Sequence, residues 1–384
     1  MAAADRVADW DPRDPDVLVD QLRAYDQMRG RCPVAHSDDL GWSVFRHEDV
    51  VAVAEDHETF SSAVSGAHPA VPNGYDPPAH TGYRAIVERY FTPEKVAGFD
   101  GQFRRLAREM VLWLPRGVAF EFIDGFATRY ALRTQQLWLG WSRVASDALE
   151  EWTRRNQNAS RIGDRAELDA VAAHFDAAVG SVIALRRTQP VDGDVTTELL
   201  EEELDGRPLT DAEIVSVLRN WTVGELGTMA ASVGIIAEFL AGNPHVQAQL
   251  RSDPTQLPLA VDEILRINTP LLANRRLATA EVTLSGRTIA AGERVTIFWA
   301  SANRDESVFG DPDAYDPVRN AEHNVLYGRG IHDCPGAPLA RLELIVVTEE
   351  LLAGTSMIRP VEDSAPDFAV SPAGGFATLH LEFD

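Results

Sequence analysis

The sequence predicts a mainly α-helical protein with small β-sheets. Helical patterns occupy most of the chain from about residue 80 to residue 185, and a long proline-free pattern follows from Thr210 to Leu240. By contrast, the predicted strands are short: Trp42–Phe45, a hairpin over residues 281–289, and Val295–Trp299. A chain of 384 residues has room for two or three domains, although single folds of this size exist.

The helix expected over residues 210–242 has clear signals at both ends. Thr210 and Glu213 have the spacing of a capping box, while Gly242 and Pro244 mark the C-terminal end. At 1.5 Å per residue this helix would be about 48 Å long. Because its middle has small and apolar residues on every side, we expect it to be buried and to cross the centre of the protein.

Composition excludes several classes of function. The formal net charge is -24, which disfavours binding to nucleic acid or to anionic lipid. The cluster Arg104, Arg105 and Arg108 is a local exception that could meet an acidic redox partner. We recognise no signal peptide and no apolar stretch of about 20 residues. No nucleic-acid partner and no membrane span are therefore expected.

The two cysteines, Cys32 and Cys334, lie too far apart in sequence to suggest a zinc or disulfide framework. Their scarcity fits a reducing cytoplasm. Residues 62–79 form a long loop with four prolines, and long loops in compact domains often cover a binding site.

The segment Leu326–Gly336 has the strongest chemical signal. Gly328, Gly330 and Gly336 allow tight turns and a close approach to a flat ligand. Cys334 directly precedes a predicted helix, whose positive N-terminus would favour a thiolate. A thiolate ligand pushes electron density onto haem iron and favours cleavage of the O–O bond.

This segment resembles the cysteine-ligand loop of the cytochrome P450 superfamily in its bacterial soluble form. Tyr327 stands where that family usually has phenylalanine. The resemblance implies the cytochrome P450 fold, haem b (iron protoporphyrin IX) as cofactor, Cys334 as the metal ligand, and Tyr327, Gly328 and Gly336 beside the haem.

Two further motifs match the family. Glu263 and Arg266 resemble its Glu-x-x-Arg pair, and Arg319 resembles the arginine that completes this structural network. The resemblance also implies that His80, Arg84, Arg276 and His332 bind the haem propionates.

The resemblance extends from about residue 15 to the end of the chain. One haem site that draws on all these segments implies a single domain over residues 1–384. Within it we expect an N-terminal segment (1–45), a substrate-covering loop (62–79), a central distal helix (210–242) and the cysteine-ligand loop (326–336).

The central helix departs from the family's pattern of small-Gly-x-acid-Thr. If Gly224 sets the register, Leu226 occupies the acid position and Gly227 the alcohol position, while Glu225 and Thr228 are each displaced by one residue. Three interpretations remain open. Glu225 and Thr228 form a shifted proton relay, ordered water or the substrate delivers the proton, or the site uses peroxide instead of dioxygen. An ion pair between Glu225 and Arg219 is the plain structural alternative.

Candidate substrate-contacting residues come from the covering loop and from the segment after the Glu263 helix. They are Val64, Val71, Tyr75, Leu271, Leu272 and Ala273.

The expected function is oxidation of a small organic substrate by a haem-thiolate monooxygenase. Because we recognise no Rossmann fingerprint and no further cysteines, electrons are expected from a ferredoxin with its ferredoxin reductase, or from a flavodoxin-type donor. A peroxide-driven peroxygenase and a non-catalytic haem-binding module are the alternatives. The sequence does not name the substrate.

Overall fold

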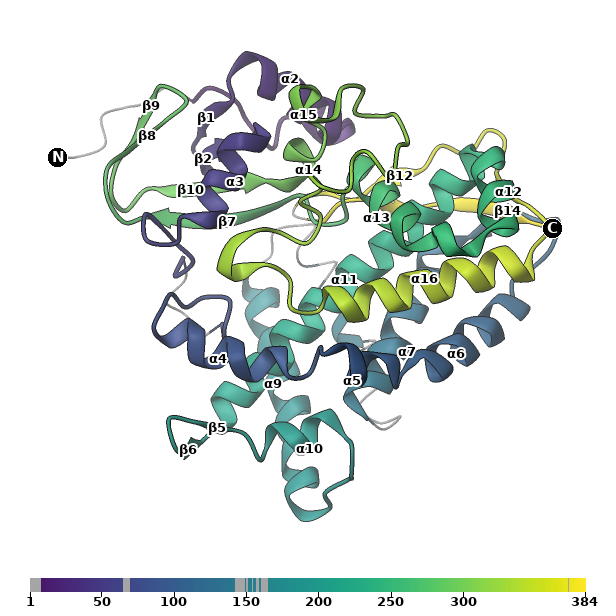
Figure 1. Ribbon diagram of the computed structural model, residues 1–384, viewed down its shortest axis with the longest axis horizontal. Helices are drawn as coiled ribbons and strands as arrows, with labels where there is room; N and C mark the ends of the chain where they lie inside the picture. The colour runs from purple at the N-terminus through teal and green to yellow at the C-terminus, as the bar shows by residue number, and fades with distance from the viewer. Residues whose placement is uncertain are drawn as a thin grey trace.

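The computed structural model describes residues 8–384 except 65–69, 142–148, 150, 154, 157–158, 160–164 and 372. Helices predominate, as predicted, and the strands are short (Figure 1). The α-helices are α1 (Pro15–Val19), α2 (Gln21–Arg31), α3 (His47–Glu55), α4 (Ala79–Glu88), α5 (Pro93–Ala97), α6 (Asp100–Leu112), α7 (Thr128–Leu139), α9 (Arg165–Thr188), α10 (Val195–Leu199), α11 (Asp211–Gly242), α12 (Pro244–Ser252), α13 (Leu257–Ile267), α14 (Trp299–Ala302), α15 (Glu306–Phe309) and α16 (Ala337–Gly354).

Short helical turns of other types lie between these helices. They are a π-helical turn η1 (Ile123–Ala127) and two 3₁₀ turns, η2 (Pro254–Gln256) and η3 (Gly330–His332). The strands are β1 (Val34–Ser37), β2 (Gly41–Val44), β3 (Phe60–Ser61), β4 (Phe120–Glu121), β5 (Glu203–Leu204), β6 (Arg207–Pro208), β7 (Ala273–Ala278), β8 (Val282–Leu284), β9 (Arg287–Ile289), β10 (Arg294–Phe298), β11 (Ile358–Pro360), β12 (Asp367–Phe368), β13 (Phe376–Thr378) and β14 (His380–Phe383).

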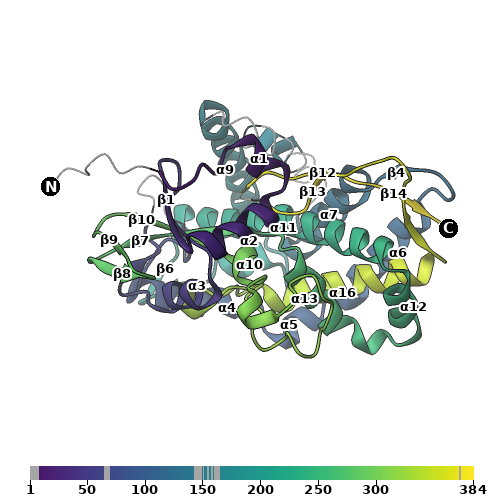
Figure 2. The ribbon, with the colours of Figure 1, turned by 90° about the horizontal axis from the view of Figure 1, so that it is seen from above.

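Helix α11 crosses the middle of the molecule and packs against α7, α9, α13 and α16 (Figures 1 and 2). Its N-terminus has the predicted capping box, in which the Thr210 and Glu213 side chains each bond the other's backbone N–H. The helix ends at Gly242, as predicted. Most of its apolar side chains are buried, so the predicted central core helix is confirmed.

Two helices have the length and mean hydropathy of a membrane span, contrary to our expectation from the sequence: Ala166–Thr188 and Asp211–Gly242. Helix α11 belongs to the protein core, and 61% of its most apolar window is buried inside the protein. Helix α9 has a stripe of buried residues at four-residue spacing, Val171, Phe175, Val179 and Ile183. Its apolar side therefore packs against protein, as in an amphipathic helix of a globular fold.

A five-stranded sheet in the order β1-β2-β10-β7-β3 forms one side of the molecule. Strands β2 and β10 are parallel, and the other pairs are antiparallel. The predicted hairpin over residues 281–289 is present as β8 and β9. Its turn residues Ser285 and Gly286 have φ angles of 44° and 76°, and their positive sign is typical of tight hairpin turns.

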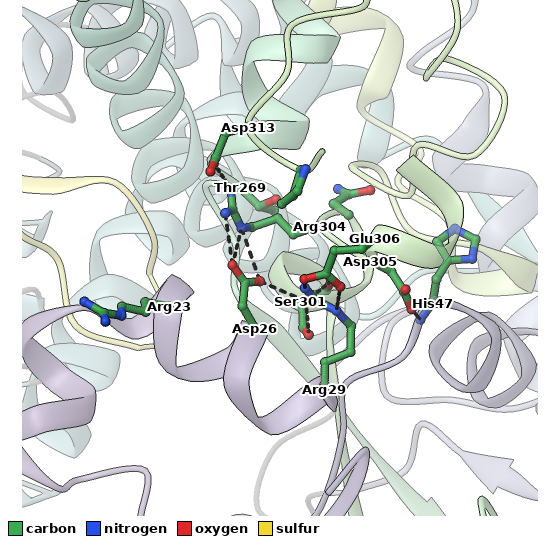
Figure 3. A network of polar contacts seen from close by, with 12 residues as sticks. Arg23, Asp26, Arg29, His47, Thr269, Ser301, Arg304, Asp305, Glu306 and Asp313 are labelled. Carbon is green, nitrogen blue, oxygen red and sulfur yellow. Dashed lines mark hydrogen bonds and ion pairs between the residues drawn. The ribbon is translucent and has the colours of Figure 1, made fainter. Parts of the chain in front are cut away.

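Buried arginines join α2 to the segment that follows β10 (Figure 3). Arg29 contacts Glu306 at 2.8 Å and Asp26 at 2.9 Å, while Arg304 contacts Asp26 at 3.0 Å and Asp313 at 2.8 Å. The Arg29 and Arg304 side chains are only 3% and 8% exposed. Asp26 therefore balances part of the charge of two buried guanidinium groups.

We expect Asp26→Ala to lower the free energy of unfolding by about 2–3 kcal/mol, because it leaves two buried guanidinium groups short of an acceptor. Asp313→Ala is the matched control. Asp313 is 72% exposed and also pairs with Arg304, so its removal should cost less than about 1 kcal/mol. Urea denaturation measures both values, and equal losses would contradict this assignment.

Candidate active site around Cys334

The cysteine loop is held by its own backbone. The Cys334 N–H donates to the carbonyl of Tyr327 at 2.8 Å, and Ala337 N–H donates to the Cys334 carbonyl at 3.3 Å. Gly330 has a φ of 76°, and a Cβ atom there would lie 2.4 Å from the carbonyl oxygen of Ala54. Only glycine fits this position, because both the positive φ and the close approach to α3 exclude a side chain.

The Cys334 thiol is surrounded by protein, yet its surface is accessible because Cys334 lines a cavity of about 330 Å³. Burial raises the pKa of this thiol to about 11, and the backbone N–H of Gly336 only partly offsets the effect. The helix N-terminus expected to favour a thiolate is therefore outweighed by burial. A thiolate here needs a cation beside it, which fits iron ligation.

Tyr327 joins the loop to α13 and α16. Its hydroxyl donates to Asp262 at 3.3 Å, and the Arg341 Nε donates to the other Asp262 oxygen at 2.9 Å. The Arg341 guanidinium also lies 4.3 Å from the centre of the Tyr327 ring. The tyrosine thus retains the aromatic contact of the family pattern and adds a polar link that phenylalanine cannot make.

Three basic side chains gather at the cysteine loop: His332 of the loop itself, His80 and Arg276. Among the described residues, none of them has a hydrogen bond to an acidic side chain. The rings of His80 and His332 are 4.4 Å apart, and the Nε2 atom of each is buried and has no hydrogen-bond partner among the described residues. Arg276 is 7% exposed, and its one hydrogen-bond partner among the described residues is the carbonyl of Arg275. Burial, reinforced by His80 and Arg276, lowers the pKa of His332 to about 3.

Buried donors without acceptors are costly unless a ligand satisfies them. Two carboxylates would complete the set formed by His80, Arg276 and His332, so these residues fit the propionates of haem b.

Arg84 has a different set of partners from the one predicted. Its guanidinium bonds Asp333 and Glu88 side chains at 2.5 and 2.7 Å, and the Asp333 carbonyl at 2.6 Å. These contacts tie Arg84 to the cysteine loop. A guanidinium has five N–H donors, so the predicted propionate contact stays a prediction.

Glu263 and Arg266 form the predicted pair, with the Arg266 Nε 2.8 Å from Glu263 and both side chains buried. The predicted third member is wrong by one position. Asn320, not Arg319, donates its side-chain amide to Glu263 at 2.7 Å. Arg319 is exposed, and its described contacts do not include Glu263.

Helix α11 has an open face near the cysteine loop. Cβ atoms added at Gly224 or Gly227 would meet nothing within 4 Å, and Val223 is 47% exposed. The Thr228 hydroxyl donates to the Gly224 carbonyl rather than to Glu225. Glu225 is turned toward α16, where its carboxyl lies within hydrogen-bonding reach of Glu343.

The ion pair between Glu225 and Arg219 is absent, because Arg219 pairs with Asp176. Glu343 was missed from the sequence, although an acid within the apolar stretch of α16 could have drawn attention to it.

The covering loop is fixed to α11 where it is described. Val71 N–H donates to the Ser216 hydroxyl at 2.9 Å, and the Asn220 amide donates to the Val71 carbonyl at 2.8 Å. Neither Ser216 nor Asn220 was predicted. Residues 65–69 of the predicted loop lie outside the described residues.

The candidate pocket residues have mixed outcomes. Val71 is fully buried, Val64 is 42% exposed, and Tyr75 packs beside Tyr83 with ring centres 5.5 Å apart. Leu272 lies in a core cluster with Phe298, and the partly buried Ala273 packs against that cluster, so the predicted substrate contact of both stays a prediction. Leu271 pairs through its backbone with Ala373.

Comparison with known proteins agrees with this geometry. The family model described as Cytochrome P450 matches residues 166–369. The chain belongs to the cytochrome P450 family. The erythromycin C-12 hydroxylase of Saccharopolyspora erythraea is 30% identical over 88% of this P450 and 87% of the relative. The linalool 8-monooxygenase of Pseudomonas putida is 27% identical over 89% and 91%.

The solved structure of a mutant of P450 EryK in complex with erythromycin B superposes with a TM-score of 0.84. It is 29% identical, and the match covers 94% of this P450 and 96% of that chain. The predicted fold is thus confirmed. The protein is a P450 monooxygenase, an oxidoreductase whose cofactor is haem b. These relatives support an enzyme over the alternative of a non-catalytic haem-binding module.

We expect Asn320→Ala to destabilise the protein by about 1–3 kcal/mol and to increase haem loss, because the buried Glu263 carboxylate would lose a donor. Arg319→Ala is the control and should leave both properties nearly unchanged. Urea denaturation and haem retention during gel filtration measure the effects. A larger effect at Arg319 would restore the network expected from the sequence.

Proposed function

We propose that this P450 oxidises a small organic substrate, using dioxygen and electrons from a ferredoxin-type or flavodoxin-type partner in the cytoplasm. The observation that supports the proposal best is the open face of α11 at Gly224 and Gly227, which lies under the loop fixed by Ser216 and Asn220. A substrate held there would be shielded from water, since the loop closes one side. We propose that residues 1–384 act as one domain around this site.

The proposed cofactor contacts come from four residues. Cys334 would ligate the iron, while His80, Arg276 and His332 would hold the propionates. The bound haem supplies oxygen activation, and the net reaction consumes one dioxygen, two electrons and two protons to give an oxygenated product and water.

The chain's own residues supply protons and position the substrate. We propose that Glu225 and Thr228 form the shifted proton relay. Thr228 lies at i+3 from Glu225, and at 100° per residue its Cα lies between Gly224 and Glu225 around the helix. Thr228 is thus adjacent to both the open face and the buried acid.

A peroxide-driven reaction is a second candidate, because the Thr228 hydroxyl bonds the Gly224 carbonyl and Glu225 is turned toward α16. Assays with peroxide and with reductase plus ferredoxin separate the two. The named substrates of the relatives, erythromycin and linalool, leave the substrate class open. Spin-state titration with a compound library identifies it.

Electron entry is proposed on the side of the cysteine loop away from α11. A cavity of about 330 Å³ opens there, lined among others by Cys334, Arg329 and Arg341. The arginine cluster on α6 that the sequence suggested as a docking site has less unpaired positive charge than expected. Arg104 and Arg108 pair with acids of α16, Glu349 and Glu350, leaving Arg105 without a described ion pair.

We expect Arg329→Glu to slow reduction by an acidic ferredoxin about tenfold at low salt, because the contact becomes repulsive. Reduction by dithionite should not change. Arg105→Glu on α6 is the matched charge reversal and should leave the ferredoxin rate unchanged. Stopped-flow measurement of haem reduction tests both, and a slower rate with Arg105→Glu would move the docking site to α6.

We expect Glu225→Gln to slow product formation at least tenfold, with more reduced oxygen released as peroxide, because the relay loses its acid. Substrate affinity from the spin-state titration should be unchanged. Glu238→Gln changes another partly buried acid on α11 and should have no such effect. Unchanged coupling of electrons to product in Glu225→Gln would contradict the relay.

A further inference from the structure

Two glutamates from different helices meet in the core of the protein. Glu225, which is partly buried with one buried carboxyl oxygen, lies in the middle of α11, and Glu343, which is 0% exposed, lies in α16. Their carboxyl groups are within hydrogen-bonding reach of each other. Helix α7 closes the cluster from a third side, since it packs on α11 and its Tyr130 hydroxyl donates to the Glu343 carbonyl at 2.9 Å.

Among the described residues, no positive charge lowers the pKa of either carboxylate. The side chains that shift the pKa values of these acids are the two acids themselves and, for Glu343, Thr134. The Thr134 hydroxyl already donates to the carbonyls of Tyr130 and Ala131, each at 3.1 Å. Two further titratable groups lie in electrostatic range: the buried Tyr130 phenol interacts with both acids, and the Cys334 thiol interacts with Glu225.

Two buried carboxylates without a cation repel each other strongly and lose their hydration. Neither oxygen of Glu343 accepts from a donor among the described groups. A proton placed between the acids removes the repulsion and forms a charge-assisted hydrogen bond. Burial raises the pKa of both groups, in agreement with this state.

The pair lies next to the reaction face without being part of it. Glu225 directly follows Gly224, and Thr228 lies about 60° from Glu225 and 40° from Gly224 around the helix axis. A proton that leaves the pair toward the open face therefore passes the Thr228 position. The offset of the acid by one residue from the family pattern places it against α16.

We propose that Glu225 and Glu343 share one proton and store it for the reaction, with Glu343 as a positioning residue that acts through Glu225. This proposal rests on the proposed relay. The singly charged pair releases one proton toward Thr228, becomes a dicarboxylate, and regains a proton from water before the next cycle. Electrons come only from the redox partner, so the pair changes in protonation and not in oxidation state.

The first test measures the proton without any turnover. Between pH 4.5, the ordinary pKa of glutamate, and the higher pKa of the folded pair, the folded state binds the proton and the unfolded state does not. The pair's contribution to stability is therefore full at low pH and is lost as pH rises through this window. One proton makes the unfolding constant increase about tenfold per pH unit there.

The double variant Glu225→Gln, Glu343→Gln should lack this component in urea denaturation of the haem-loaded protein. Infrared spectroscopy at neutral pH should also show a protonated-carboxyl band that the double variant loses. Identical pH dependence of unfolding in the wild type and the double variant, with no change in the band, would overturn the shared proton whatever the activity.

The second test measures the use of the proton. Glu343→Gln retains the shape and a hydrogen-bond donor but cannot release a proton, so it should lower the coupling of electrons to product about threefold to tenfold and change the solvent isotope effect. Glu343→Asp should restore part of the coupling. Glu238→Gln is the matched control, and haem content and spin-state titration should be unchanged in all three.

The two proposals fail in different ways. If Glu225→Gln impairs coupling and Glu343→Gln does not, the relay stands and the stored proton is wrong. If neither variant changes coupling while the double variant still alters the pH dependence of unfolding, the pair is structural only and the relay itself is wrong. Loss of haem in Glu343→Gln with normal coupling per haem would likewise mark a purely structural pair.

Discussion

The buried pair of Glu263 and Arg266 is the interaction on which the geometry of the cysteine loop depends. Arg266 donates to the carbonyls of Asn303, Pro312 and Ala314, at 2.7, 3.2 and 3.1 Å. Glu263 accepts from the backbone of Asp316 at 2.9 Å and from Asn320. Each charge is therefore satisfied by its partner and by the chain that leads to the loop, which is what makes a buried ion pair tolerable.

Asn303 links this ion pair to the cysteine loop, because its backbone carbonyl accepts a hydrogen bond from Arg266. The Asn303 side-chain oxygen accepts from the Val325 N–H at 2.9 Å, just before Leu326. The contacts that hold this irregular stretch therefore include the Glu263–Arg266 pair and the amides of Asn303 and Asn320. The position of Cys334 follows from contacts made more than 60 residues earlier in the sequence, because Arg266 fixes the path of the intervening chain.

Sequence reasoning identified the residues whose role depends on local pattern. The ends of α11 follow from Thr210, Glu213 and Gly242, since caps are set by neighbours within one turn. The family resemblance implied the Glu263–Arg266 pair, and its i and i+3 spacing puts both side chains on one face of a helix. The family pattern located Cys334, and the loop's hydrogen bonds agree with that location.

The sequence could not specify contacts that depend on side-chain direction between distant segments. Asn320 and Arg319 are neighbours, and only the turn after Asp316 decides which of them points at Glu263. The contact of Arg84 with Asp333 could not be read from the sequence, because it depends on how the cysteine loop packs against α4. Glu225 was recognised as displaced, yet the direction of its carboxyl depends on α16, which lies more than 100 residues away.

The attachment of Val71 to α11 has a consequence for ligand traffic. Ser216 and Asn220 lie one turn apart on the same side of the helix and bond the N–H and the carbonyl of a single residue. Outward movement of the chain at Val71 would break both bonds together, because both belong to one residue. A molecule that passes beside Val71 would therefore displace two polar contacts in a single step.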